Sequence, residues 1–364
     1  MSTFSPSNVT QCPNKQAMLN DFYNNCGAAQ LIEPAPLAEF ELSPLNTSGV
    51  QKLSQQLIPG PGKKGRVELV YYQRLPESVV ENKTDCDKTC TATNEIGDGK
   101  IEVEMDICDR EEANLKMNAD DFILSCRGNG QLAAERLSLL MDAVVRKTYT
   151  RITNRAMGNI GKWATNVQGT ESNAFQILDI ATLKPSSTTD FNPFAMVKLK
   201  TALMKTGYCA PPVMFAGETF YNYMQALSVG CCASDGLNLL DTLRKFGQAV
   251  MYDMRVENNW TADGIFITQP GAQQVVFWDP YAGGREMNAA LNVGPAARNY
   301  ETFTLFHPRS GMPINFLIKD ECPGELHIIA STTADVFAMP TDMFPSGDRM
   351  TGVVFSNRAK VVNS

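Results

Sequence analysis

Residues 131–157, QLAAERLSLLMDAVVRKTYTRITNRAM, form the strongest helical pattern in the chain. Apolar or small side chains recur there every three or four residues, the repeat of one helix face: Ala133, Leu137, Leu140, Val144, Thr148 and Ile152. Basic residues flank this stripe: Arg136, Arg146, Lys147, Arg151 and Arg155. At ~1.5 Å per residue the helix would be about 40 Å long. The pattern predicts a spine for the other elements, with a solvated or salt-bridged basic flank favoured over one that touches nucleic acid.

Two strand patterns precede this helix. Residues 66–74 (RVELVYYQR) and 100–107 (KIEVEMDI) alternate apolar with polar side chains, as in a strand with one covered face. Residues 76–99 between them are polar and turn-rich, so the strands are predicted to pair as a long ribbon with this segment at its tip. An isolated ribbon is marginally stable at best, which implies a partner surface.

The N-terminal residues 1–60 are rich in Ser, Asn, Pro and Gln and contain only short apolar pieces. This composition predicts an extended arm. Such an arm is not stable alone, so if it is ordered it lies along another surface, of its own chain or of a neighbour. The arm and the ribbon together point to assembly.

The rest of the chain mixes helical and strand patterns. Helices are predicted over 192–206, 218–227 and 237–245, and residues 265–278 predict two short strands around a Pro-Gly turn. Further strands are predicted at 210–216, 250–256, 302–306, 314–319, 325–330, 336–339 and 352–356. This order of elements predicts an α+β fold.

The composition offers little material for catalysis. The chain has 364 residues, a formal net charge of −7, and 43% hydrophobic and 20% charged residues, typical of a globular protein. His307 and His327 are its two histidines, and we interpret both as structural because no nucleophile motif accompanies them. No phosphate-binding loop or dinucleotide-binding glycine motif is present. We therefore expect no catalytic site, no cofactor and no enzymatic activity.

Signals for membranes and export are also missing from the sequence. The longest apolar runs, such as 275–278, fall far short of the roughly 20 residues that a spanning helix needs. Residues 1–11 lack the basic start and the apolar stretch of a secretory signal. We expect no membrane contact and a reducing interior.

Cysteines and carboxylates supply two candidate sites, both with plainer interpretations. Cys86 and Cys90, with Cys108 and Cys126, could ligate zinc, but the second pair is eighteen residues apart, so free thiols are favoured and no metal is expected. The acidic residues of 85–121 are interpreted as a solvated face rather than as an acid/base pair.

Three stretches carry a resemblance to a known family: 211–223 (PPVMFAGETFYNY), 269–278 (QPGAQQVVFW) and 340–352 (PTDMFPSGDRMTG). The first looks like the strand-then-helix of the axial domain in the major capsid protein of tailed bacteriophages, the Hong Kong 97 type. The order of arm, ribbon, long helix, mixed middle and terminal strands is also similar to that family. From about residue 54 onward, the chain resembles such a capsid protein.

The resemblance implies a Hong Kong 97-like fold with five parts. These are an N-terminal arm at 1–60, an extended loop over a neighbouring subunit at 61–120, a peripheral domain with the spine helix at 121–174, an α/β axial domain at 175–298, and return strands of the peripheral domain at 299–364. It further implies a structural shell subunit whose pentamers and hexamers form an icosahedral phage head around double-stranded DNA. The implied partners are other copies, portal, scaffold or decoration proteins, and DNA through weak contacts, in a virion assembled in the host cytoplasm.

Two alternatives belong to other classes. An encapsulin-type nanocompartment shell has the same fold without a genome, so DNA or a packaged enzyme inside particles would separate the two. A soluble enzyme is the third hypothesis, which a deep pocket with converging titratable groups would support. Some family members carry a cleaved helical scaffolding segment; residues 1–61 show no heptads, so we expect no cleavage and a separate or absent scaffold.

The net charge generates a prediction about DNA. Because Lys and Arg contacts to phosphate supply most non-specific affinity, a subunit with a net charge of −7 should bind duplex DNA weakly. Titration of the unassembled subunit with duplex DNA at several salt concentrations measures this. Tight, strongly salt-dependent binding would contradict the interpretation as a passive container.

Overall fold

The computed structural model describes most of the predicted strands and the long helix. The described residues are 20, 33–43, 50–53, 58–59, 64–72, 98–106, 109–118, 129–159, 213–218, 221–222, 225, 249–259, 264–268, 270–278, 300–322, 325–338 and 355–358. The helices predicted at 192–206 and 237–245, and the four cysteines of the zinc hypothesis, lie outside them.

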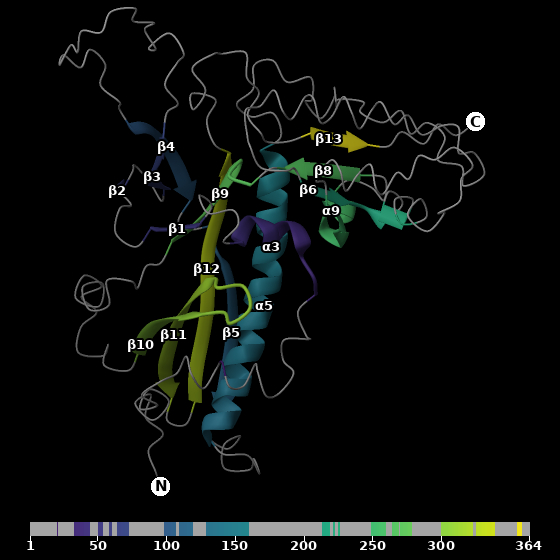
Figure 1. Cartoon of the computed structure of the whole chain (residues 1–364). Coiled ribbons are helices and arrows are strands. Elements are labelled where there is room, and N and C mark those ends of the chain that lie inside the picture. The colour runs from purple at the N-terminus through teal and green to yellow at the C-terminus, as the bar shows by residue number, and fades with distance from the viewer. Residues whose placement is uncertain are drawn as a thin grey trace, which may run out of the picture.

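Helices and mainly antiparallel strands make this an α+β protein, as predicted (Figure 1). In chain order the elements are α3 (Pro36–Leu42), β1 (Val50–Leu53), β2 (Ile58–Pro59), β3 (Lys64–Tyr72), β4 (Asp98–Asp106), β5 (Glu111–Asn118), α5 (Asn129–Gly158), β6 (Val213–Ala216), β7 (Ala249–Tyr252), α9 (Met254–Asn259), β8 (Gly264–Thr268), β9 (Gln273–Trp278), β10 (Tyr300–Phe306), β11 (Pro313–Cys322), β12 (Glu325–Ala338) and β13 (Phe355–Arg358). In the described part of the chain, no helix is both long and apolar enough to cross a membrane.

Three sheets organise these strands. The six-stranded sheet has the order β1-β9-β12-β11-β10, with β5 paired to β12. The four-stranded sheet has the order β13-β8-β6-β7, and the ribbon sheet has the order β2-β3-β4. β12 is the central strand of the largest sheet, because β11 and β5 pair with its first part and β9 pairs with its second part.

The predicted spine helix is confirmed as α5, which lies across the six-stranded sheet (Figure 1). Every described member of the predicted stripe is buried, from Leu137 to Ile152. The buried face is wider than predicted, however, because a second row is also inaccessible: Met141, Val145, Tyr149 and Ala156. These side chains belong to one core that also contains Phe316 of β11, Phe215 of β6 and Phe266 of β8. One continuous core therefore joins the spine helix to both larger sheets.

A piece of the predicted arm is built into this core. α3 begins with Pro36 and has no cap from its own N-cap side chain; instead, the Leu37 N–H donates to Asp253 Oδ2 at 2.9 Å. Phe40 of the same helix lies against Phe215, with ring centroids 5.6 Å apart. The expectation that an ordered arm lies along another surface is met here by the chain's own surface.

Asp253 also explains one wrong prediction. The apolar pattern 250–256 predicts a single strand, but β7 ends at Tyr252 and α9 begins at Met254. The Asp253 side chain accepts the Arg255 N–H at 2.8 Å, and its carbonyl accepts the Glu257 N–H. An aspartate in this position favours the first turn of a helix over continued strand pairing.

The strands predicted at 302–306 and 314–319 are confirmed as β10 and β11, the strand predicted at 352–356 overlaps β13 at 355–356, and two predicted strands are merged into one. The patterns 325–330 and 336–339 belong to one strand, β12, because the polar residues between them remain in the ladder. Thr332 Oγ1 donates to the Pro313 carbonyl at 3.0 Å, so its hydroxyl is satisfied inside the sheet. A β-branched residue with a satisfied hydroxyl does not interrupt a strand.

In three places, strands pair across the boundaries between the five parts that the sequence resemblance implies. Residues 111–118, assigned from the sequence to the extended loop, form β5 and pair with β12. β9, assigned to the axial domain, lies in the six-stranded sheet, and β13, assigned to the return strands, pairs with β8. The two strands flanking the Pro-Gly turn therefore form as predicted but enter different sheets, with Gly271 at a φ of 80° between them. Hydrophobic patterns reveal strands but not their partners, which accounts for these differences.

The predicted ribbon is confirmed as an antiparallel pair of β3 and β4. Their register places Lys64 opposite Asp106 and Tyr72 opposite Asp98, so all nine residues of each strand are paired. At ~3.3 Å per residue the ribbon is about 30 Å long. It lies to one side of the six-stranded sheet (Figure 1).

The spine helix generates a stability prediction. Leu140 is 6% exposed, so Leu140→Ala should lower the free energy of unfolding by roughly 2–5 kcal/mol, as for other buried leucines. Arg146→Ala, on the exposed side of the same helix, should cost about 0.5 kcal/mol or less. Denaturant unfolding of the purified protein measures both. Equal losses, or a larger loss for Arg146→Ala, would mean that the helix buries a different face.

Candidate functional site

The chain leaves the ribbon through a short segment held between α5 and the six-stranded sheet. We call residues 103–106 and 109–111 the ribbon root, because they are the end of β4 and the described residues at the start of β5. β5 is fixed by its pairing with β12 from Glu111↔Thr332 to Asn118↔Glu325. The ribbon root is therefore the place where the ribbon is attached to the body of the subunit.

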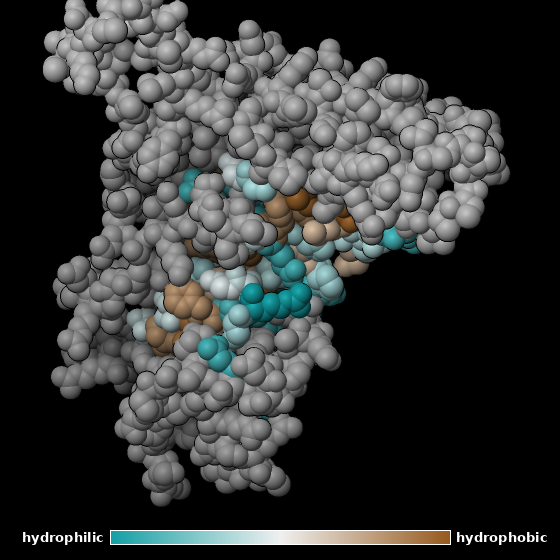
Figure 2. All heavy atoms as spheres, viewed as in Figure 1, coloured by the Kyte–Doolittle hydropathy of each residue, from teal (hydrophilic) through white to brown (hydrophobic). Residues whose placement is uncertain are grey.

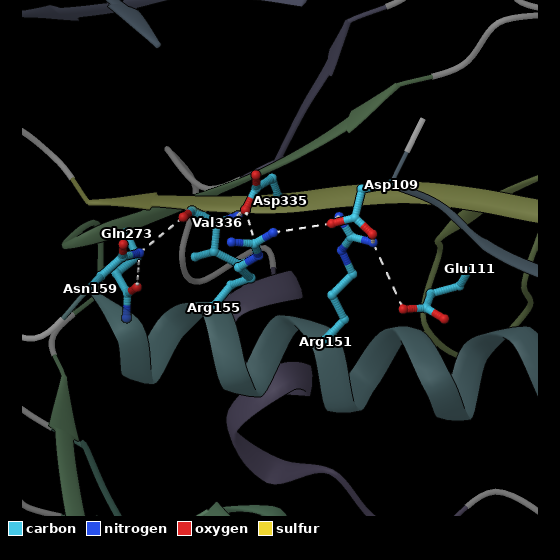
Figure 3. A network of polar contacts seen from close by, with 8 residues as sticks. All are labelled: Asp109, Glu111, Arg151, Arg155, Asn159, Gln273, Asp335 and Val336. Atoms are coloured by element: carbon cyan, nitrogen blue, oxygen red, sulfur yellow. Dashed lines mark hydrogen bonds and ion pairs between the residues drawn. The ribbon is translucent and has the colours of Figure 1, made fainter. Parts of the chain in front are cut away.

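Two arginines of α5 hold the ribbon root. Arg151 donates both terminal nitrogens to the Asp109 carboxylate, at 3.0 and 2.8 Å, and its Nη1 lies 3.8 Å from Glu111 Oε1 (Figure 3). Arg155, one turn later, donates to Asp109 at 3.2 Å, and its Nε lies 3.5 Å from Asp335 of β12. We call these five residues the arginine clasp. It joins the ribbon root, the spine helix and the central strand.

Part of the predicted basic flank of α5 forms ion pairs in the clasp. The expected salt-bridged flank is confirmed for Arg151 and Arg155, while Arg146 and Lys147 are exposed. The Arg151 side chain is only 9% exposed, whereas the helical pattern places it on the solvated flank. A buried guanidinium needs a paired carboxylate, which Asp109 supplies in a two-bond geometry. Among the acidic residues interpreted as a solvated face, Asp109 and Glu111 thus neutralise arginine.

An apolar contact fixes the other side of the root. Met105 of β4 is fully buried with Val276 of β9. Val103, Trp278 and Phe337 pack against this pair. The structure describes the ribbon side chains of 103–106. Among them, Val103 and Met105 of β4 form a hydrophobic contact between the ribbon and the body. The ribbon is therefore seated at one end.

A series of buried hydrogen bonds connects the end of α5 to α3, which is part of the predicted arm. Asn159 Nδ2 donates to Gln273 Oε1 at 2.9 Å and to the Val336 carbonyl at 3.0 Å (Figure 3). Gln273 Nε2 in turn donates to Glu41 Oε1 of α3 at 3.2 Å. Paired buried polar groups of this kind specify one arrangement of the elements that carry them. Sequence reasoning missed this chain, because its members lie far apart in sequence and belong to no motif.

His307 lies in the turn between β10 and β11 and is fully buried. Its Nε2 lies 3.5 Å from Asp142 Oδ1 of α5, and its Nδ1 lies 2.9 Å from Ser310 Oγ. An aspartate, a histidine and a serine in contact are the residues of a hydrolase triad. Here, however, the Ser310 N–H also donates to the ring at 3.1 Å, and a fully buried ring offers a substrate no access. These contacts favour the structural interpretation of His307.

Tyr149, also buried on α5, is not a base at neutral pH. Burial, followed by the nearby Glu39 carboxylate, raises the pKa of its phenol to about 12. The Arg255 guanidinium lies over its ring, 5.9 Å from the centroid, as in a cation–π contact. The residue thus joins α5 to α9 as a neutral, packed side chain.

The other sequence candidates are separated or fall outside the described residues. His327 lies half-buried on β12, opposite Lys319 of β11 and Lys116 of β5 in the register, far from the turn that holds His307. Within the described ranges, no group of three or more His, Cys, Asp or Glu side chains is placed to hold a metal ion. The expected absence of cofactor and metal stays a prediction.

The arginine clasp generates a prediction about the root. Asp109→Ala removes the shared carboxylate and leaves Arg151 with Glu111 alone. Asp109 is 50% exposed and screened by solvent, so the global free energy of unfolding should fall by only about 1 kcal/mol. Locally, the amides of the ribbon root should exchange with solvent faster, as measured by hydrogen–deuterium exchange.

The matched control is Arg110→Ala, which removes the exposed Arg110–Glu112 pair at 2.7 Å without touching the clasp. It should leave exchange at 103–106 unchanged. Equal exchange in both variants would mean that the clasp does not hold the root.

The chain is similar to solved capsid structures over most of its length. One is the capsid asymmetric unit of cyanophage A-1(L), 12% identical, covering 88% of this chain and 93% of that chain with a TM-score of 0.49. Others are the mature capsid of bacteriophage PhiM1 (11%, 88% and 87%, TM-score 0.38) and the virus-like particle from Pyrococcus furiosus (9%, 91% and 96%, TM-score 0.40). No family model and no curated protein matches the sequence. The first two structures are phage capsids, and the third is a virus-like particle.

Proposed function

We propose that this chain is a structural shell subunit whose copies assemble into a closed container. The observation that carries the proposal is the ribbon, a pair of nine-residue strands that is seated on the body of the protein through Val103 and Met105. A small sheet without further packing is marginally stable. A long ribbon that is anchored at one end is suited to contact another copy.

The sequence of the ribbon supports a second surface beyond the root. Val103 and Met105, which are seated on the body, belong to an alternating apolar row. The same alternation continues outward through Ile101 on β4 and through Leu69, which is opposite Ile101 in the register. Alternation predicts that these positions share the face of Met105. A neighbouring subunit would cover this continued row.

Exposed apolar side chains on the body also favour contacts between copies. Among the residues whose side chains the structure describes, five large hydrophobic ones are more than a third exposed: Leu139, Met251, Tyr252, Met254 and Phe306. Three of them lie at or next to β7, the edge strand of the four-stranded sheet. In Figure 2, apolar residues gather over β10 and β11 and beside β6 and β8, with hydrophilic residues between the two areas. Apolar surface near an edge strand is typical of a contact site.

The finer assignment extends the same proposal. The six-stranded sheet with α5 would be the peripheral domain, and the four-stranded sheet would belong to the axial domain near five- and six-fold positions. The shell would be an icosahedral phage head around double-stranded DNA, within a virion assembled in the host cytoplasm. Portal, scaffold or decoration proteins would be further partners. A net charge of −7 supports a container that holds DNA without binding it tightly.

Light scattering and negative-stain microscopy of the expressed chain test the proposal. We expect closed particles of megadalton mass, and a solution that contains 40.0 kDa monomers at every concentration would overturn it. Nucleic acid in particles purified from an infected host would support the phage head. A packaged protein without nucleic acid would instead indicate a nanocompartment.

Shortening the ribbon tests its role. Replacing residues 76–97 by a short Gly-Ser turn leaves β3 and β4 intact and should abolish particles while the subunit stays folded. The matched control is a Gly-Ser segment of the original length. It distinguishes an effect of the length of residues 76–97 from an effect of their amino-acid sequence. Circular dichroism confirms folding, and normal particles from the shortened chain would show that the ribbon does not join subunits.

A further inference from the structure

The turn between β10 and β11 is closed by hydrogen bonds that begin and end on its buried histidine. The His307 N–H donates to the Met312 carbonyl at 2.9 Å, and the Gly311 N–H donates to the His307 carbonyl at 2.8 Å. Gly311 has a φ of 66°, in the left-handed region that favours glycine. The His307 ring is fully buried. A change in the hydrogen bonds of this ring therefore acts directly on the turn.

The backbone of Ser310 fixes the position of the ring hydrogen. The Ser310 N–H donates to His307 Nδ1 at 3.1 Å, so Nδ1 is an acceptor and carries no hydrogen in this conformation. A neutral ring then carries its one hydrogen on Nε2, which lies 3.5 Å from Asp142 Oδ1. Ser310 Oγ lies 2.9 Å from Nδ1 and can donate to the same nitrogen. The closed turn therefore holds His307 in one neutral tautomer.

A second proton on the ring is incompatible with the closed turn. It would be added to Nδ1, where the Ser310 N–H already points, and two N–H groups cannot bond to each other. The Ser310 hydroxyl could accept from a protonated Nδ1, but the Ser310 N–H would lose its acceptor. A donor without an acceptor costs free energy, so the peptide would rotate toward water or another acceptor. Protonation of the ring and opening of the turn are therefore coupled.

The groups around the turn favour a positive charge on this ring over one elsewhere. A buried imidazolium needs a negative charge beside it, which the Asp142 carboxylate of α5 supplies. Tyr149, also near Ser310, has a pKa of about 12 because of its burial and stays neutral. The other charged groups near the turn or near Tyr149 are Arg309 of the turn, Glu39 of α3, Arg255 of α9 and Arg146 of α5.

The same turn carries one of the contacts that hold α3. Arg309 Nη2 donates to Glu39 Oε1 at 3.0 Å. The other contacts of α3 lie on different elements, among them the bond from the Leu37 N–H to Asp253 and the packing of Phe40 on Phe215. Rotation of the turn would release the Arg309–Glu39 bond and leave these contacts in place. The state of the turn therefore sets how tightly one side of α3 is held.

We propose that His307 is a proton-sensitive latch: when its Nδ1 takes up a proton from solvent, the 307–312 turn opens and its bond to α3 is released. Histidine is the side chain whose charge ordinarily changes between about pH 5 and 8, so mild acid would open the latch. The ring is fully buried, so the proton enters while the turn is locally open. The inference concerns the single subunit and does not depend on the proposed shell function.

Hydrogen–deuterium exchange of the full chain tests the latch. After correction for the intrinsic pH dependence of exchange, amides of 307–312 should exchange about fivefold faster at about pH 5.5 than at about pH 7.5, as expected for the loss of one hydrogen bond. Amides of 36–42 should show a smaller increase. His307→Asn has an amide oxygen on Cγ, as the histidine has Nδ1, and this oxygen accepts an N–H without titrating. Its exchange at 307–312 should be the same at both pH values.

The matched control is His327→Asn, which removes the other histidine and should behave like the wild type. Nitrogen-15 NMR of histidine-labelled protein adds a test that needs no change at His307, and His327→Asn assigns its signals. The His307 ring should carry a hydrogen on Nε2 alone at about pH 7.5 and on both nitrogens at about pH 5.5.

Three results would overturn the latch. They are a hydrogen on Nδ1 at the higher pH, a ring that stays neutral at the lower pH, and exchange at 307–312 that does not depend on pH or depends on it equally in His307→Asn. If His307→Asn does not fold, the NMR measurement decides. Neither measurement reads particle formation, so a failure of the shell function and a failure of the latch are distinguishable.

Discussion

The packing of α5 against β12 is the contact on which the rest of the subunit depends. β12 pairs with three other strands, and α5 covers them with two buried rows of side chains. α3 and α9 reach the same helix, through Phe40 and Val256 in the shared core and through Arg255 over Tyr149. Loss of this contact would expose the faces of several elements at once, because their buried side chains share one core with α5.

Polar contacts orient the parts that this apolar core holds together. Hydrophobic burial has no preferred direction, so it tolerates small rotations of one element against another. The Asp253 carboxylate, which accepts N–H groups from both α3 and α9, fixes the angle between those helices. The arginine clasp does the same for the ribbon root. Buried or half-buried ion pairs add little net stability, and their better-attested role is to specify one arrangement.

The sequence predicts the elements with strong repeats and fails where partners decide the structure. α5, β3 and β4 are predictable because each carries a long, regular pattern within one segment. β5 and β13 could not be assigned to their sheets, since alternation shows that a strand has a covered face but not which strand lies beside it. The break between β7 and α9 depends on one capping side chain, Asp253, inside an otherwise apolar stretch. The candidate site is partly predictable: the basic flank is visible in the sequence, whereas Asp109, 42 residues from Arg151, and Asp335 on β12 are recognised as its partners only in the fold.

The two kinds of contact at the ribbon root differ in a way that matters for assembly. Met105 and Val276 hold the root by burial, which charge screening does not weaken and which gives no preference for one approach of a neighbour. The clasp holds it by directed bonds from Arg151 and Arg155 at a partly exposed surface, where charge and geometry both count. In the proposed shell, a subunit that keeps its ribbon attached and presents it at one angle needs both. The apolar seat supplies attachment, and the clasp, placed on the rigid spine helix, supplies direction.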